Sequence, residues 1–144
     1  MITVTPIQIF GEDDRGSNYM WNCHRTGDFM LCYRHAGSSS GQHYHEGKSD
    51  NKNPEVMFLF SGTALLHWSP LDGTSITTTE IKAPARVEVP VNIWHQLIAV
   101  TDCCFIELNS AADVQKDSIR LWREDFEKII EENNRKRIIH GHGK

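Results

Sequence analysis

Turn-forming residues interrupt the first two thirds of this sequence at short intervals, and this spacing limits the chain to short elements. Glycine, proline, asparagine and aspartate mark turns because they adopt or preset the backbone conformations that tight turns need. The clearest turn segments are Gly11 to Gly16, Thr26 to Asp28, Gly37 to Gly41, Ser61-Gly62, Pro70 to Gly73, Pro84 and Thr101-Asp102. The intervals between them suit short strands better than long helices.

The segments between these turns are rich in β-branched and aromatic residues, which favour extended strands. The predicted strands are Ile2 to Phe10, Phe29 to His35, Glu55 to Phe60, Thr63 to Trp68, Ser75 to Ile81, Arg86 to Val89, His95 to Val100 and Cys103 to Leu108. Short strands that follow one another without intervening helices pack as a sandwich or close into a barrel. The sequence therefore predicts an all-β fold.

Only the C-terminal segment has a helical period. Its apolar residues form one stripe of a helix, made of Leu121, Trp122, Phe126, Ile129 and Ile130. We expect this helix over about residues 117–134, with Asp117 or Ser118 as its N-cap.

Length and charge narrow the class of partner. A chain of 144 residues has the usual size of one domain, so we expect residues 1–144 to form a single domain. The net charge of -4 lacks the basic surface that nucleic-acid binding requires. The sequence also contains no apolar run of membrane-spanning length and no signal-peptide pattern at its start. We expect a cytoplasmic protein that acts on a small molecule.

Four potential metal ligands lie near the predicted strands. His43 and His45 are two residues apart, and on a strand this spacing places both imidazoles on one face. Glu55 opens an apolar strand, where an inward carboxylate needs a cation or hydrogen-bond donors. His95 begins another apolar strand. Three imidazoles and one carboxylate suit a divalent transition metal, namely iron, manganese, nickel, cobalt or zinc, with coordination positions open for a substrate.

The order of these ligands resembles the two motifs of the cupin superfamily. The first motif is matched by Gly37, His43, His45, Glu55 and Gly62. The second is matched in part by Pro90, Asn92 and His95, with Asn92 in place of a glycine. One departure is the long segment 46–54 between His45 and Glu55, which leaves open whether Glu55 reaches the metal.

The cupin resemblance covers about residues 29–109. It implies a double-stranded β-barrel, or jelly roll, to which the C-terminal helix is added. Cupins include oxygenases, isomerases, epimerases, decarboxylases and non-enzymatic binders, so the resemblance implies a site without fixing a reaction.

Two further segments resemble the nucleotide-sugar 3,4-ketoisomerases and 3,5-epimerases of the cupin class. The turn Asp13 to Gly16 looks like one near the start of those enzymes, and the C-terminal strands and helix are similar to theirs. The resemblance implies isomerisation or epimerisation of a keto-sugar nucleotide by proton transfer next to a carbonyl. In that reading Arg15 pairs with the diphosphate. Trp94 either packs at the end of the barrel or stacks on a substrate.

These sugar-nucleotide families generally work without a metal. If the three histidines hold a metal, another group must move the proton, and Tyr33 and His35 on the preceding strand are the candidates.

Two other functions fit the same motifs. A metal-dependent iron oxygenase would use the open positions for dioxygen and a small organic substrate. A non-catalytic cupin would bind a small ligand and have no proton-transfer group near the metal.

A separate prediction concerns assembly. Phe58 and Phe60 are expected on the outer face of their strand, which predicts that a second subunit covers this sheet in a homodimer.

Overall fold

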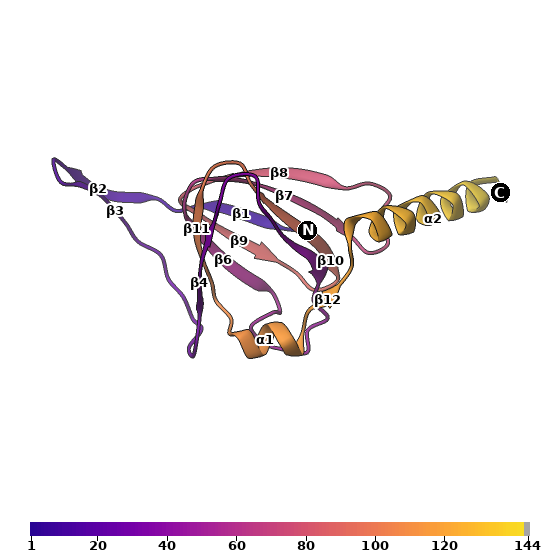
Figure 1. The fold of residues 1–144 in the computed structure, drawn as a ribbon, viewed down its shortest axis with the longest axis horizontal. Helices are drawn as coiled ribbons and strands as arrows, with labels where there is room; N and C mark the ends of the chain where they lie inside the picture. Colours follow the sequence, from indigo (N-terminus) through magenta and orange to yellow (C-terminus); the bar gives the residue numbers. More distant parts are fainter. Residues whose placement is uncertain (143–144) are drawn as a thin grey trace.

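The computed structural model describes residues 1–142, which form two five-stranded antiparallel sheets and a separate hairpin (Figure 1). In one sheet the strand order is β1-β9-β6-β11-β4, and in the other it is β12-β5-β10-β7-β8. The strands are β1 (Thr3–Pro6), β2 (Ile9–Asp13), β3 (Gly16–Tyr19), β4 (Met30–Arg34), β5 (Ser39–Tyr44), β6 (Glu55–Ser61), β7 (Thr63–Pro70), β8 (Thr77–Lys82), β9 (Ala85–Val89), β10 (Ile93–Ala99), β11 (Cys103–Glu107) and β12 (Ile119–Arg120). The helices are α1 (Ala111–Lys116) and α2 (Arg123–His142).

The two sheets form an open sandwich of jelly-roll type. Within residues 1–142, no ladder of backbone hydrogen bonds joins one sheet to the other, so the closed barrel expected from the cupin resemblance is wrong in this respect. The space between the sheets is filled by apolar side chains from both, including the fully buried Leu59, Ile81 and Phe105.

The N-terminal segment departs from the predicted single strand over Ile2 to Phe10. Ile7 is buried, since its backbone N–H donates to the Pro84 carbonyl and its side chain packs against Val56 and Phe58 on the outer face of β6. The chain then leaves the sheet as the β2–β3 hairpin, which projects away from the sandwich (Figure 1). The other predicted strands are present with boundaries shifted by two residues or fewer.

The outer face of β6 is covered by the same chain, which corrects the reason given for a dimer at Phe58 and Phe60. The Trp21 ring lies 5.4 Å from that of Phe58 and 5.2 Å from that of Phe60, measured between centroids. Phe58 is therefore buried, and Phe60 is half-buried. A second subunit is not needed to cover these two rings.

The C-terminal helix is confirmed, but its predicted start is wrong. A capping box made by Ser110 and Asp113 begins the short helix α1, and Asp117 ends that helix rather than starting the long one. Residues 119–120 then pair with β5, so α2 begins only at Arg123. Neither helix in the described part of the chain has the length and hydropathy that a membrane crossing requires.

Candidate metal centre

The structure brings the four predicted ligands together between the two sheets. His43 lies on β5, His45 directly follows it, His95 lies on β10, and Glu55 opens β6 in the facing sheet. One donor atom from each of these side chains lies within 4.8 Å of the others. The Glu55 Oε2 atom is 2.7 Å from Nε2 of His45 and 3.1 Å from Nε2 of His95.

Two unusual backbone conformations set the register of the histidine strands. His43 pairs with His95, and the ladder shifts directly after this pair. Gly41 lies at the shift with φ of 88°, where an added Cβ would be 2.9 Å from the carbonyl oxygen of His95. Asn92 has φ of 61° in the turn before β10, so an asparagine adopts the left-handed conformation that a glycine would otherwise supply here.

The hydrogen bonds of the imidazoles indicate which nitrogen carries the proton. Nδ1 of His45 is 2.6 Å from the carbonyl oxygen of Asp117, and Nδ1 of His95 is 2.9 Å from that of Ile93. A carbonyl oxygen only accepts, so each Nδ1 donates and each Nε2 of a neutral ring presents a lone pair. Both lone pairs face the Glu55 carboxylate.

This arrangement fits a cation between the side chains. Lone pairs that face a carboxylate repel it, and the Nε2 atom of His95 is buried with no hydrogen-bond partner in residues 1–142. Ligands about 2.1 Å from one ion and at right angles are roughly 3 Å apart, close to both Nε2–Oε2 distances. Imidazoles that donate their second nitrogen to a carbonyl are also the usual arrangement of metal-bound histidines.

The pKa shifts keep the donor groups ready for a metal. Burial, assisted by the neighbouring His95, lowers the pKa of His43 to about 2, so that ring is neutral. Burial raises the pKa of Glu55, and the charge of Lys52, whose Nζ atom lies 3.2 Å from Oε1, lowers it and favours the carboxylate. A carboxylate and a neutral imidazole are the forms that bind a metal ion.

Lys52 completes the site and was not predicted from the sequence. Its side chain is almost fully buried, and its Nζ atom lies 3.2 Å from Oε1 of Glu55, the oxygen that does not face the histidines. The ammonium therefore leaves Oε2 free for a metal. A lysine in the polar stretch between Gly47 and Pro54 gives no sequence signal, because its burial depends on how that loop folds back.

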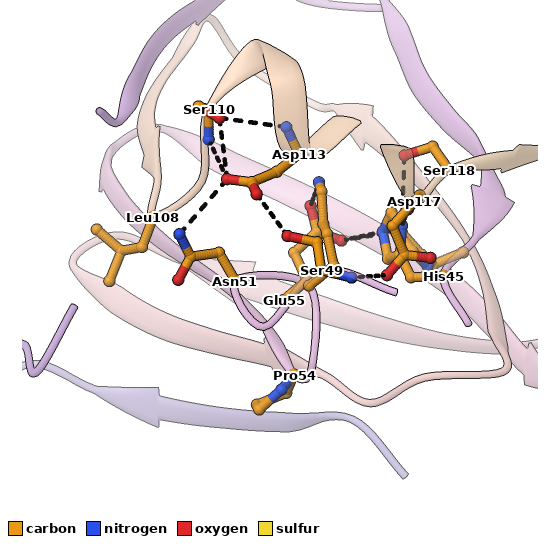
Figure 2. Close-up of polar contacts among 12 residues, drawn as sticks. His45, Ser49, Asn51, Pro54, Glu55, Leu108, Ser110, Asp113, Asp117 and Ser118 are labelled. Atoms are coloured by element: carbon orange, nitrogen blue, oxygen red, sulfur yellow. Dashed lines mark hydrogen bonds and ion pairs between the residues drawn. The ribbon is translucent and has the colours of Figure 1, made fainter. Parts of the chain in front are cut away.

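Segment 46–54 is held down by Asp113, in the first turn of α1, and by Asp117, at the C-terminal end of α1, which explains how Glu55 returns to the site (Figure 2). The Asp117 carboxylate accepts backbone N–H groups from Glu46 at 2.7 Å, Gly47 at 3.0 Å and Ser49 at 3.2 Å. Asp113 accepts the hydroxyl of Ser49 and caps its own helix. Asp117 thus orients both the loop, through its carboxylate, and His45, through its carbonyl.

Replacing Asp117 with asparagine should loosen this loop. The amide group of the new side chain would face backbone N–H donors, so at least one buried donor loses its partner, and the free energy of unfolding should fall by about 1–3 kcal/mol. Metal affinity should fall roughly 10–100-fold, as for other groups that orient ligands. Urea unfolding and calorimetric metal titration measure the two effects. Asp125→Asn, on an exposed face of α2, is the matched control and should change neither.

A cavity of about 50 Å³ between the sheets is lined by three of the four ligands, His43, Glu55 and His95. Its wall is mostly apolar, and the side chains that form it besides the ligands His43, Glu55 and His95 include Met57, Leu66, Val87, Val89, Leu97, Phe105 and Glu107. This space accommodates an ion and a few water molecules but is well below the volume of typical ligand pockets. A large substrate therefore has only its reacting end near the ligands.

The other predicted site residues do not line this cavity. Tyr33 is 71% exposed, because alternation along β4 points Cys32 and Arg34 inward and Tyr33 outward, and His35 is exposed just beyond the strand. These positions give no support to proton transfer by either residue in this chain.

Arg15 and Trp94 also lie away from the cavity. Arg15 lies between β2 and β3, where it is exposed and paired with Asp13. Trp94 is fully buried on the opposite face of β10, where Nε1 donates to the Leu121 carbonyl. A ring without exposed surface cannot stack on a substrate.

Comparison with known proteins rests on structure alone. No protein-family model matches this chain, and no curated protein matches its sequence. The sugar 3,4-ketoisomerase QdtA of Thermoanaerobacterium thermosaccharolyticum, solved in complex with TDP, superposes with a TM-score of 0.65 and 14% identity over 94% of this chain and 96% of that chain. The fold is that of the sugar 3,4-ketoisomerases.

Two other solved structures agree with this assignment of the fold. A 3,4-ketoisomerase from Helicobacter canadensis has a TM-score of 0.61 at 13% identity, over 90% of this chain and 97% of that chain. The 3'-monoepimerase ChmJ from Streptomyces bikiniensis, in complex with dTDP-quinovose, has a TM-score of 0.62 at 15% identity. The match covers 81% of this chain and 67% of that chain. The ketoisomerase fold thus extends over nearly the whole chain.

Proposed function

We propose that this protein is a metal-binding cupin that isomerises a keto-sugar nucleotide by moving a proton next to a carbonyl. The observation that carries the proposal is the convergence of His43, His45, Glu55 and His95 beside a cavity, in a fold shared with TDP-sugar ketoisomerases over nearly the full chain. One of the solved QdtA variants holds TDP-4-keto-6-deoxyglucose, which is the first substrate to test.

The roles follow from the positions of the side chains. His43, His45, Glu55 and His95 hold one divalent transition metal, which when bound supplies a Lewis acid for the substrate carbonyl. The carbonyls of Asp117 and Ile93 orient two of the imidazoles. The apolar wall surrounds the reacting carbons, so charges in the cavity interact more strongly than in bulk solvent. The sugar ring enters by its reacting edge, and the nucleotide stays outside the cavity.

Hydrogen exchange tests the reaction. Incubation with TDP-4-keto-6-deoxyglucose in deuterium oxide should place deuterium on the carbon next to the carbonyl, because a deprotonated intermediate exchanges with solvent. Mass spectrometry of the recovered sugar nucleotide measures this exchange, and elemental analysis of the same sample should give one metal per chain. Absence of exchange over hours at high protein concentration would contradict the isomerase.

One observation favours a second candidate, a metal-dependent oxygenase acting on a small organic substrate. The cavity wall is largely apolar, and a set of three imidazoles and one carboxylate suits iron. Oxygen uptake with ferrous iron and a suitable substrate, without deuterium exchange into the keto sugar, would favour the oxygenase. If neither reaction occurs and a small ligand stays bound through purification, the protein is a non-catalytic cupin.

We also propose a homodimer, on different grounds from those suggested by Phe58 and Phe60. The β2–β3 hairpin and the segment after it expose Phe10 (64%) and Met20 (72%), and a two-stranded hairpin outside a sheet is marginally stable alone. The edge strand β4 also exposes Leu31 and Tyr33. A second copy of the chain can cover both surfaces.

Light scattering should therefore give the dimer mass. The double variant Phe10→Glu and Met20→Glu should be monomeric, whereas Ile138→Glu, at an exposed site on α2, should remain dimeric. A monomeric mass for the unmodified protein at micromolar concentration would contradict this assembly.

A further inference from the structure

Glu107 is an ionisable residue of the cavity wall that the metal centre does not use. It ends β11, where alternation directs Cys103, Phe105 and Glu107 into the space between the sheets. It pairs across the sheet with Met57, two residues beyond Glu55 on β6. Its side chain thus faces the cavity from the same sheet that carries the Glu55 ligand.

The Glu107 side chain is half-buried in the cavity wall. Its ionisation is influenced first by burial and then by the charges of Glu55, Lys52, Arg34 and His95. Burial, followed by repulsion from Glu55, raises the pKa of Glu107 to about 7. A carboxyl group with a raised pKa in the wall of a cavity is a candidate for proton transfer.

We propose that Glu107 is the base that takes the proton from the substrate carbon and the acid that returns it to the neighbouring carbon. The inference rests on the proposed isomerase function. His43, Glu55 and His95 are the other ionisable side chains of the cavity wall in the described part of the chain, and they serve as ligands. Glu107 is then the ionisable group left to exchange a proton with the substrate.

The proton transfer balances within the substrate and one carboxyl group. Glu107 takes the hydrogen of the C–H(OH) carbon as a proton, the C–H electron pair forms a carbon–carbon double bond, and the carbonyl oxygen becomes an enediol oxygen as it takes a proton from water. The second hydroxyl of the enediol then loses its proton to water and becomes the new carbonyl. At the same time the double-bond pair takes the proton back from Glu107 at the former carbonyl carbon.

The presence of a single proton-transfer group also distinguishes between isomerisation and epimerisation. Glu107 removes and returns the proton from one side of the substrate, which moves a carbonyl between adjacent carbons. Epimerisation at one carbon needs a second acid on the opposite face, and the cavity wall offers no further ionisable group among residues 1–142 once the ligands are set aside. The structure therefore favours a ketoisomerase over an epimerase.

Glu107→Gln tests the assignment, because it keeps the size of the side chain and removes its basicity. We expect both turnover and deuterium exchange to fall about 10²–10⁴-fold. Metal content and the circular dichroism spectrum should stay unchanged. Glu80→Gln, an exposed carboxylate on β8, is the control and should keep full activity.

A second variant separates a chemical role from a structural one. Glu107→Ala leaves space for a small acid, so added formate should restore a measurable part of the exchange, whereas a loss caused by misfolding is not restored. Full exchange activity in Glu107→Gln, or an inactive Glu107→Ala that formate does not restore while its metal content and spectrum are normal, would overturn the role of Glu107. If the unmodified protein itself shows no exchange, the isomerase proposal fails first.

Discussion

Replacing His95 with alanine will abolish stoichiometric metal binding. The variant loses a buried ligand that faces Glu55 at 3.1 Å and that is oriented by the Ile93 carbonyl. Removing a group that only orients a ligand costs roughly 10–100-fold in affinity, so the loss of a ligand should exceed about 100-fold. The same result is expected for His43→Ala and His45→Ala, and a smaller loss for Glu55→Gln, which keeps an oxygen donor.

Metal analysis after dialysis against a chelator measures this effect. His67→Ala is the matched control, because His67 lies on β7 outside the cluster and its ring is hydrogen-bonded to Thr78. Equimolar metal in His95→Ala after dialysis would remove His95 from the ligand set.

Replacing Phe126 with alanine will destabilise the fold by about 3–5 kcal/mol. Phe126 is fully buried on α2, and its ring stacks on Trp94 with centroids 4.8 Å apart. Removing it leaves a cavity beneath the helix and exposes Trp94, the residue directly before His95.

Urea unfolding measures the loss, and the melting temperature should fall by roughly 10 °C. Ile138→Ala, on the exposed part of the same helix, should change the free energy of unfolding by less than about 0.5 kcal/mol. Similar values for the two variants would show that α2 does not depend on the Trp94 contact.

The strands that could be predicted are those with an apolar inner face. The segment Glu55 to Phe60 has this pattern and is present as β6. By contrast, β5 has the polar sequence from Ser39 to Tyr44, and β12 has two residues, so neither carries a local signal. Their positions come from pairing with β10 and β5. Pairing with neighbouring strands therefore determines that these two segments are strands, although their local sequence does not favour one.

The ligand set was accessible from the sequence because strand periodicity and motif order determine which side chains point inward. Lys52 and Asp117 were not, since their burial depends on a loop packing against a helix end far along the chain. Two features that the sequence analysis did not identify do have a recognisable sequence pattern. Ser110 and Asp113 have the spacing of a capping box, and Glu107 alternates with the apolar Phe105.

The four ligands belong to different layers of the sandwich, with Glu55 in one sheet and the three histidines in or directly beside the strands of the other. Any ion that binds all four acts as a cross-link between the sheets and has no equivalent site in the unfolded chain. Its binding free energy is therefore added to the stability of the fold, by about 2.7 kcal/mol when the free ion is at a hundred times its dissociation constant. The supply of metal in the cell would then control how much of this protein survives, besides how much of it is active.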